Sequence, residues 1–165
     1  MKIILKKELT GSILDIGGGG EGIIGRLYGS RVTAVDNRQE ELDEAPDTCT
    51  KLCMDATALA FADESFDAVT AFYSLLFMTA GEQERAIAEG IRVLRPGGRL
   101  CLWDCAVESA YPNPFVTELD VDLEGELLHT SYGICKLDSQ SRESILSSPN
   151  YYVMLLFPSV TAYFL

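Results

Sequence analysis

A cluster of glycines follows a single acid near the start of the chain. Residues 17–22 contain five glycines and Glu21, and they come directly after an apolar run, residues 12–16, that holds Asp15. Glycines let the backbone turn tightly and let a ligand approach main-chain N–H groups that a Cβ would shield. A helix that starts after such a turn adds unpaired N–H donors. These residue types in this order predict a turn that binds a nucleoside or a dinucleotide.

Two kinds of ligand fit this turn. Gly17-x-Gly19-x-x-Gly22 matches the glycine fingerprint of NAD(P)-binding oxidoreductases, and Asp36 follows at about the right distance to hold a ribose. We expect Asp15 to point at the ligand's entry edge, where a carboxylate would repel a pyrophosphate and attract a cationic amine. The glycines alone leave both ligands open, whereas Asp15 favours the cation.

Asp36 ends a predicted strand at residues 31–35. A carboxylate at this place can accept hydrogen bonds from both hydroxyls of a ribose. Its alternative role is to cap the helix that we expect to begin near Arg38. We favour the ribose because the glycine turn precedes it, and this assignment does not identify which nucleoside is bound.

Two segments resemble one family of enzymes. Asp15-Ile16-Gly17-Gly18-Gly19 resembles the first motif of the class I S-adenosylmethionine-dependent methyltransferase superfamily, type 11-like, which is an acid, any residue and Gly-x-Gly. Residues 92–100, Arg-Val-Leu-Arg-Pro-Gly-Gly-Arg-Leu, resemble the connection from a helix to the fifth strand in the same superfamily, and NAD-binding proteins lack it. The resemblance covers residues 12–104. It implies S-adenosylmethionine, a cationic sulfonium with an amino-acid tail, as the cofactor.

The resemblance also implies which residues hold the cofactor. In that family an acid after the third strand, here Asp55, meets the adenine amine, and a helix cap is its alternative role. The floor of the pocket would lie after the fourth strand, near Tyr73. The complete set of expected cofactor-binding residues is Asp15, Gly17, Gly18, Gly19, Asp36, Asn37, Asp55, Ala56 and Tyr73.

Apolar periodicity predicts an α/β fold with one domain over residues 1–165. Residues 82–94 carry apolar side chains on one face and predict an amphipathic helix. Short apolar runs predict buried strands at residues 12–16, 31–35, 51–54, 66–72 and 100–103. The resemblance implies a Rossmann-like, seven-stranded, mostly parallel sheet with an antiparallel C-terminal hairpin, for which residues 151–157 and 160–165 are candidates. Residues 1–10 are expected to be only a lead-in.

Residues 106–136 are expected to form a β-rich flap that carries substrate specificity and closes over the cofactor. Within it, residues 116–123 and 127–135 would pair antiparallel across Glu124-Gly125-Glu126. His129, the single histidine, is a candidate general base, and Asp104 and Tyr111 are further catalytic candidates. The alternative for His129 is a half-exposed strand residue with no catalytic role.

Composition limits the partners. With 13 basic and 25 acidic residues the net charge is −12, which disfavours nucleic acids and anionic membranes. The five cysteines are odd in number and follow no signal sequence, so we expect reduced thiols, a cytoplasmic protein and no metal site. The longest apolar run, residues 151–157, is too short for a membrane span of about twenty residues. The apolar C-terminal segment, residues 151–165, leaves a homo-oligomer open, because a second copy could cover it.

The expected function is transfer of a methyl group from S-adenosylmethionine to a small-molecule nucleophile. A sulfonium is already an activated leaving group, so alignment of the nucleophile matters more than a catalytic triad, and none is evident in the sequence. Two other functions stay open, which are an NAD(P)-dependent oxidoreductase and a non-catalytic module that binds S-adenosylmethionine. The sequence does not identify the substrate.

Overall fold

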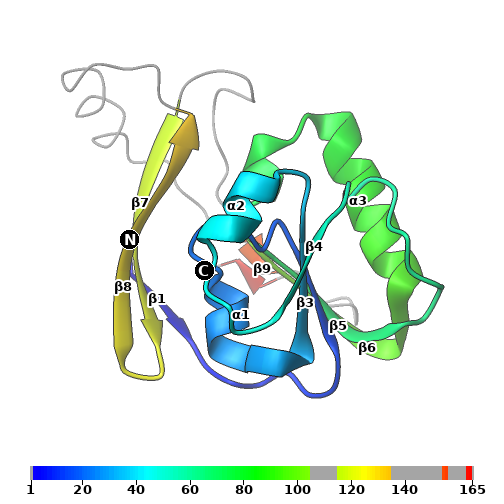
Figure 1. Cartoon of the computed structure of the whole chain (residues 1–165), viewed down its shortest axis with the longest axis horizontal. Coiled ribbons are helices and arrows are strands. Elements are labelled where there is room, and N and C mark those ends of the chain that lie inside the picture. The colour runs from blue at the N-terminus through cyan, green and yellow to red at the C-terminus, as the bar shows by residue number, and fades with distance from the viewer. Residues whose placement is uncertain (1, 105–114, 135–153, 156–162, 165) are drawn as a thin grey trace.

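A computed structural model describes residues 2–104, 115–134, 154–155 and 163–164 of the 165-residue chain. Its centre is an all-parallel sheet of five strands in the order β4-β3-β2-β5-β6 (Figure 1). These strands are β2 (Ile13–Ile16), β3 (Val32–Asp36), β4 (Thr50–Cys53), β5 (Phe66–Phe72) and β6 (Leu94–Trp103). The predicted α/β class and the five predicted strands are confirmed, with bounds that differ by a few residues.

The central strands are apolar because helices and a second sheet cover both faces of the sheet. All four residues of β2 are buried, and β5 is buried except at Asp67. Parallel strands enclosed on both faces read as continuous apolar runs rather than alternating ones. Thr70 lies opposite Asp15 in the register of β2 and β5, so the two polar residues of the sheet centre are neighbours.

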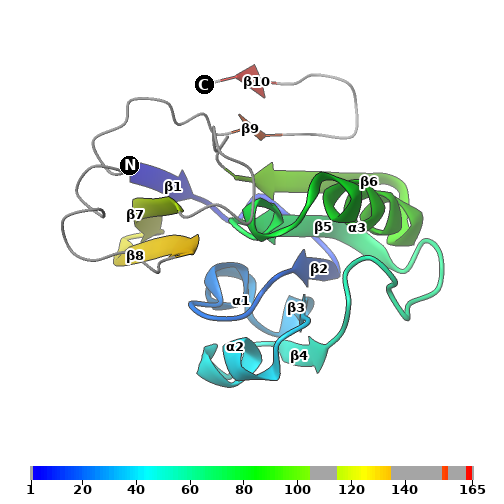
Figure 2. The same ribbon diagram turned by 90° about the horizontal axis from the view of Figure 1, so that it is seen from above.

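Among the described residues, three α-helices and two short 3₁₀ turns connect the strands of the central sheet. They are α1 (Ile23–Tyr28), η1 (Gly29–Arg31), α2 (Gln39–Glu44), η2 (Leu75–Phe77) and α3 (Ala80–Val93). α3 begins two residues before the predicted start because Glu82 accepts hydrogen bonds from the backbone N–H and the hydroxyl of Thr79, at 2.8 and 2.7 Å. Figure 2 shows α1 and α3 on opposite sides of the sheet.

The order of the strands sets the place of a ligand site. The chain runs outward from β2 through β3 to β4, and then returns to build β5 and β6 on the other side of β2. The loops after β2 and β5 therefore diverge, which opens a crevice at the carboxyl ends of these strands.

β6 contains the Pro96-Gly97-Gly98 segment rather than starting after it. Phe66 pairs with Leu94 and Ala68 pairs with Arg99, so the strand has an irregularity in register between these pairs. Gly97 has φ +79°, a value that glycine adopts without steric cost. The predicted reversal into residues 100–103 is thus an interrupted strand that begins directly at the end of α3.

A second sheet consists of β1 (Lys2–Leu5), β7 (Phe115–Leu123) and β8 (Glu126–Ile134). β7 and β8 pair antiparallel through Glu124 and Gly125, both with positive φ, as two-residue hairpins prefer. This confirms the predicted antiparallel pairing of these two segments. β1 pairs in parallel with β7, with Lys2 opposite Asp120. The expectation that residues 1–10 are only a lead-in was wrong, because alternate residues of β1, Ile3 and Leu5, are buried.

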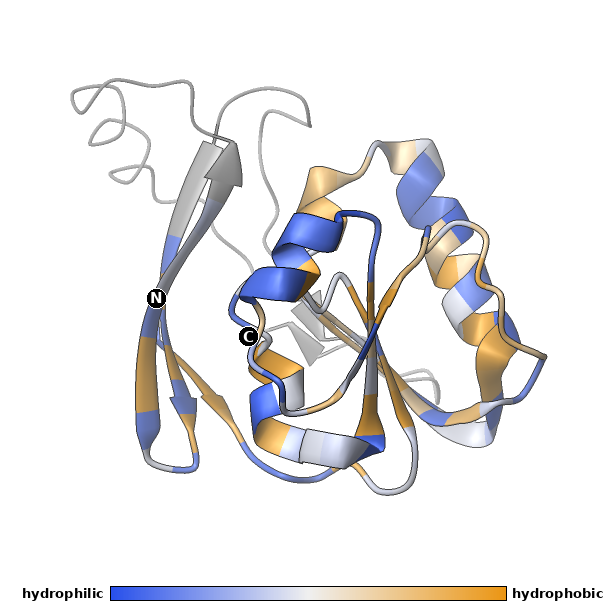
Figure 3. Ribbon diagram, in the orientation of Figure 1, coloured by the Kyte–Doolittle hydropathy of each residue, from blue (hydrophilic) through white to orange (hydrophobic). Residues whose placement is uncertain are grey.

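Two apolar cores lie on the two faces of the central sheet. The first joins α1 and the second sheet to one face, and includes Ile13, Ile24, Val32, Leu119 and Val121. The second joins α3 to the other face, and includes Leu14, Val35, Val69, Ala86 and Leu102. In Figure 3 the strands of the central sheet are mostly apolar, whereas α2 is mostly hydrophilic. The second sheet is therefore packed against the central sheet through the first core.

The described residues of the C-terminal part form a small antiparallel pair. β9 (Met154–Leu155) and β10 (Tyr163–Phe164) pair with each other as a separate sheet, and β9 lies beside β6 of the five-stranded sheet. Tyr111, Cys105, Cys135 and the remaining parts of the predicted flap and C-terminal hairpin lie outside the described residues. Within the described part of the chain, no helix has both the length and the apolar character that crossing a membrane requires.

Candidate cofactor site

A cavity of about 1000 Å³ lies at the carboxyl ends of β2, β3, β4 and β5. Its walls are the loops that follow these four strands, together with residues of α1, α2 and α3 and part of β8. A smaller depression of about 480 Å³ lies at the opposite edge of the sheet, away from the glycine turn, and is lined by residues 8–11, 67–68 and 95–99. The larger cavity occupies the crevice that the strand order creates.

The glycine turn is packed tightly against its neighbours. A Cβ built on Gly17, where φ is +69°, would lie 2.2 Å from the Cβ of Ser74. A Cβ on Gly19 would lie 2.5 Å from the Cβ of Glu41 and 3.0 Å from Oδ2 of Asp36. These glycines therefore let the turn pass between α2 and the loop after β5, in addition to exposing backbone to a ligand.

Asp15 does not point at the entry edge of the ligand, and that expectation was wrong. Its side chain is 2% exposed, and Oδ1 accepts a hydrogen bond from Oγ1 of Thr70 at 2.7 Å. The reason is its place in β2, a strand buried on both faces. Oδ2 of Asp15 lies directly under Gly18, because a Cβ on that glycine would be 2.6 Å from it. Burial raises the pKa of Asp15 to about 7, against the hydrogen bond from Thr70, and the charge of Asp36 raises it further.

Two carboxylates lie on the cavity wall at the ends of β3 and β4. Oδ1 of Asp36 accepts a hydrogen bond from the backbone N–H of Arg38 at 3.0 Å. Oδ1 of Asp55 accepts one from the backbone N–H of Thr57 at 2.8 Å, and this bond holds the pKa of Asp55 below its usual range. Each acid therefore stabilises the loop that carries it and also faces the cavity.

Seven of the nine residues predicted to bind the cofactor line the cavity, and the other two, Asp15 and Gly18, lie behind them. The seven are Gly17, Gly19, Asp36, Asn37, Asp55, Ala56 and Tyr73. The structure thus brings together residues that are up to 56 positions apart in the sequence. They come from four successive loops at one edge of the sheet.

Tyr73 turns the chain at the end of β5. It has φ +50°, an uncommon value for a residue other than glycine, and its side chain is 1% exposed. Its backbone N–H donates to the carbonyl oxygen of Trp103 at 2.7 Å, and the next residue, Ser74, donates from Oγ to the carbonyl of Ile16 at 2.8 Å. Such a conformation costs about 1 kcal/mol or more and marks sites where the surroundings fix the backbone.

The β7–β8 hairpin forms the remaining wall. Ser131 and Tyr132 line the cavity, and the Tyr132 ring stacks on that of Tyr73 with centroids 5.3 Å apart and 24° between planes. The hydroxyl of Thr130 donates to the carboxylate of Glu21 in the glycine turn. Burial raises the pKa of Tyr132 well above its usual range. The hairpin is therefore docked onto both the glycine turn and the loop after β5.

Sequence reasoning missed Glu21, Thr130 and Tyr132 as site residues. The available signal was strand alternation, since residues 128, 130 and 132 must share one face of β8. The same alternation places His129 on the other face together with Ser131, but His129 is 70% exposed and only Ser131 reaches the cavity. His129 was predicted from the chemistry of its imidazole alone, without asking which face of the strand it occupies.

The two catalytic candidates that the structure describes, His129 and Asp104, do not line the cavity. Nδ1 of His129 is 2.9 Å from Oδ1 of Asp120, and the histidine side chain is 70% exposed. Oδ2 of Asp104 accepts a hydrogen bond from the backbone N–H of Leu76 at 3.0 Å and so holds η2 in place. Neither residue is among those that line the cavity. Tyr111 lies outside the described residues.

The cavity carries a surplus of negative charge. Its acidic lining residues are Glu21, Asp36, Glu41, Glu44, Asp55 and Glu82, whereas its basic ones are Arg26 and Arg38. Arg38 pairs with Glu41 at 2.7 Å, and Arg26 lies 3.8 Å from Glu126 of the hairpin. The lining is suited to a cationic ligand and unsuited to a pyrophosphate.

Comparisons with known proteins agree with this geometry. The model of the family described as "Methyltransferase domain" matches residues 14–102. Demethylmenaquinone methyltransferase of Renibacterium salmoninarum is 38% identical over 103 residues, which cover 61% of this chain and 36% of that protein. The 27-O-demethylrifamycin SV methyltransferase of Amycolatopsis mediterranei is 32% identical over 138 residues, covering 76% of this chain and 49% of that protein.

The structural comparison gives the same result. The crystal structure of a SAM-dependent methyltransferase of Thermotoga maritima has a TM-score of 0.52 and 26% identity, over 59% of this chain and 45% of that one. This chain spans between about a third and a half of the length of the curated relatives described above. S-adenosylmethionine is the cofactor that the family and this neighbour imply, as predicted from the sequence. Since the family model matches more than half of the residues, the chain belongs to the methyltransferase domain family.

Proposed function

We propose that this chain is an S-adenosylmethionine-dependent methyltransferase that acts on a small-molecule nucleophile. The observation that carries the proposal is the cavity at the carboxyl ends of β2 to β5, where a glycine turn, Asp36 and Asp55 come together under the β7–β8 hairpin. Curated relatives named as methyltransferases support the reaction class, although the chain spans less than half of their length.

The lining residues fit the cofactor. Gly17 and Gly19 line the cavity and leave their backbone open to a ligand, and the buried Asp15 lies directly beneath Gly18 of the same turn. Asp36 is positioned to accept hydrogen bonds from ribose hydroxyls, and Asp55 is positioned to accept one from the adenine amine. The acidic lining offsets the positive charge of the sulfonium and of its amino group.

When bound, S-adenosylmethionine supplies an electrophilic methyl group on sulfonium sulfur. The task of the chain's own residues is to bring a nucleophile into line with that methyl and to exclude water. Tyr132 and Ser131 cover the cavity from the hairpin, which supports a shielding role for it. We do not assign a catalytic base, because His129 is directed to solvent and Asp104 holds the η2 backbone.

The substrate that we propose is a neutral or cationic small molecule, because acids outnumber bases around the cavity. This preference also argues against nucleic acid as a substrate. The finer predictions remain part of the proposal, namely a seven-stranded sheet completed by a C-terminal hairpin, a flap at residues 106–136 and a possible homo-oligomer.

Calorimetry tests the cofactor. Wild-type protein is expected to bind S-adenosylhomocysteine and not NAD. Asp36→Ala is expected to weaken that binding by about 1.5–3 kcal/mol, the usual worth of hydrogen bonds to a charged group, with no change in the fold. Asp67→Ala is a matched control, because Asp67 lies at the opposite edge of the sheet. Tight NAD binding without binding of S-adenosylhomocysteine would replace the proposal with the oxidoreductase alternative.

A methyl-transfer screen tests the reaction. Purified protein, S-adenosylmethionine carrying a labelled methyl and fractionated cell metabolites are expected to give a labelled small molecule. Cofactor binding without any labelled product, in repeated screens, would favour the non-catalytic binding module.

A further inference from the structure

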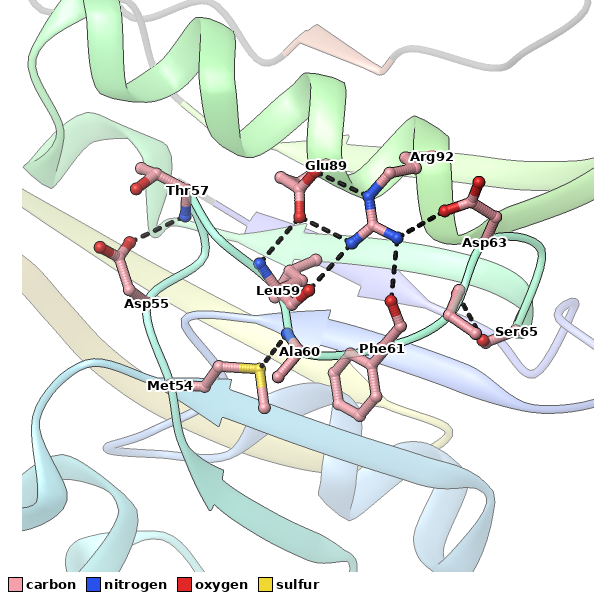
Figure 4. A network of polar contacts seen from close by, with 11 residues as sticks. Met54, Asp55, Thr57, Leu59, Ala60, Phe61, Asp63, Ser65, Glu89 and Arg92 are labelled. Atoms are coloured by element: carbon pink, nitrogen blue, oxygen red, sulfur yellow. Dashed lines mark hydrogen bonds and ion pairs between the residues drawn. The ribbon is translucent and has the colours of Figure 1, made fainter.

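One ion pair on α3 holds the loop that leads from β4 to β5. Residues 54–65 contain no helix or strand, so their backbone groups need partners outside regular structure. The guanidinium of Arg92 donates to the carbonyl oxygens of Leu59 and Phe61, both at 2.9 Å (Figure 4). Oε2 of Glu89 accepts a hydrogen bond from the backbone N–H of Leu59 at 2.8 Å. Three backbone groups of one loop are thus satisfied by two side chains.

The pair itself is well fixed. Nε and Nη2 of Arg92 donate to the two carboxylate oxygens of Glu89, both at 2.7 Å, in a bidentate arrangement. Nη1 of Arg92 also donates to Asp63 at 2.7 Å. These hydrogen bonds hold the pKa of Glu89 below its usual range and raise the pKa of Arg92. Both side chains therefore remain charged at neutral pH and keep one geometry.

The other end of the same loop faces the cavity. Asp55, Ala56 and Thr57 line it, and only Ala58 separates them from Leu59. The intervening turn is closed, because Asp55 accepts hydrogen bonds from the N–H of Thr57 at 2.8 Å and from that of Ala58 at 3.1 Å. Leu59 is itself buried, at 5% exposure. A displacement of Leu59 would therefore be passed to Asp55 through a short and tightly bonded segment.

We propose that Glu89 and Arg92 are positioning residues that determine the adenine specificity of the cofactor site by fixing the place of Asp55 and Ala56. Neither residue lines the cavity, so they act through the loop. The inference rests on the proposed function, in which Asp55 accepts a hydrogen bond from the adenine amine. Such a bond weakens steeply when its distance or angle departs from the optimum, so a small shift of the loop is enough.

The test compares two ligands that differ at the adenine amine. S-adenosylhomocysteine carries this amine, and S-inosylhomocysteine carries a carbonyl oxygen in its place. Wild-type protein is expected to prefer the adenosyl ligand by about tenfold or more, since a site built to accept a hydrogen bond rejects a ligand that lacks the donor. In Arg92→Gln the preference is expected to fall to about twofold. The variant weakens binding of the adenosyl ligand more than binding of the inosyl ligand, because only the adenosyl ligand donates a hydrogen bond to Asp55.

The ratio of the two dissociation constants separates positioning from general stability. A merely structural role for Arg92 would lower the melting temperature and weaken both ligands equally, with no change in the ratio. Arg92→Lys keeps the charge without the planar fork, and is expected to give an intermediate ratio. This variant decides the question if Arg92→Gln does not fold.

Arg95→Gln is the matched control. Arg95 also forms an arginine–carboxylate pair, with Asp67 at 2.8 Å, but at the opposite edge of the sheet. The ratio of the two ligand dissociation constants in Arg95→Gln is expected to equal that of the wild type. If wild-type protein bound neither ligand, the proposed function would fail and the inference with it. If the wild type showed the preference and folded Arg92 variants kept it unchanged, the inference alone would be overturned.

Discussion

The two walls of the cavity are built from the chain in different ways. The cofactor wall consists of the loops after β2, β3, β4 and β5, which follow one another in sequence order. The hairpin wall consists of Ser131 and Tyr132 on β8. The sheet that contains β8 also includes β1, from the start of the chain, which pairs with β7. The first wall depends on local turns at fixed places after strands. The second depends on the pairing of β1 with β7, segments more than a hundred residues apart in the sequence.

This difference suggests a division of labour. Glycines and carboxylates at the ends of parallel strands suit one cofactor and tolerate little change, because a Cβ on Gly17 or Gly19 would clash with a neighbouring side chain. The hairpin packs through the first apolar core, and at the cavity itself it contacts the cofactor wall through Thr130 on Glu21 and Tyr132 on Tyr73. We expect substitutions in the cofactor wall to affect folding and cofactor affinity, and substitutions in the hairpin wall to affect substrate use.

The largest effect is expected for Gly17→Ala. The new Cβ would lie 2.2 Å from the Cβ of Ser74, and φ at this position is +69°. We expect the free energy of unfolding to fall by about 3 kcal/mol or more, measured by urea denaturation, because both the clash and the backbone strain act on the folded state. Gly97→Ala is a matched control with φ +79° and nothing within 4 Å of the new Cβ. Gly97→Ala introduces the backbone strain without a clash, and should lower the free energy of unfolding by about 1 kcal/mol. Equal losses in the two variants would contradict the tight packing of the cofactor wall.

The second prediction concerns the pH dependence of stability through Asp15. Its pKa is about 7 in the folded chain, against an ordinary value of 3.8, so the folded state binds more protons than the unfolded state between these values. Its contribution to stability is therefore complete below about pH 4 and is lost as the pH rises towards and through 7. Asp15→Asn should remove this slope and be the more stable form at pH 8, by an amount on the order of 2 kcal/mol. Urea denaturation of both proteins from pH 4.5 to 8 measures it. An unchanged slope would show that Asp15 is not the titrating group.

Most of the cofactor wall could be predicted from the sequence because its signals are local. One strand ends in glycines and the next strand ends in an acid, a short distance along the sequence. Because the two strands are parallel neighbours in the sheet, their ends lie close together in space. Asp15 was misplaced for a physical reason, since a carboxylate is expected to seek solvent and the sequence does not reveal the hydrogen bond from Thr70, 55 residues later.

The hairpin wall could be predicted only in part. Alternation gave the antiparallel pairing of β7 and β8, because each strand carries its own period-two pattern. The pairing of β1 with β7 joins segments more than a hundred residues apart and leaves no local signal in residues 2–5. Alternation separates His129 from Tyr132 on β8, but without β1 it does not say which of these two residues faces the cavity.

The third prediction tests the attachment of the hairpin wall. Thr130→Val keeps the shape of the side chain and removes the hydroxyl that donates to Glu21. The loss of one hydrogen bond to a charged group should lower the free energy of unfolding by about 1.5 kcal/mol. If the hairpin contacts the substrate, the variant should raise KM for the methyl acceptor while the dissociation constant for S-adenosylhomocysteine stays within about twofold. A rise in the cofactor dissociation constant with no change in KM would contradict the assignment of cofactor binding to one wall and substrate use to the other.

The smallest effect is expected one residue away, on the other face of the same strand. His129 lies beside Asp120 with its side chain 70% exposed, and exposed ion pairs contribute less than about 1 kcal/mol. His129→Ala should therefore change the free energy of unfolding by about 0.5 kcal/mol or less. It should also leave kcat/KM and its pH profile unchanged, because the imidazole is not among the residues that line the cavity. Kinetic measurements on Thr130→Val and His129→Ala with the same methyl acceptor compare the roles of the two faces of β8. A loss of the acidic limb from the pH profile of His129→Ala would instead restore this histidine as the general base, because a general base is inactive once protonated. In that case the hairpin would have to present its outer face to the substrate.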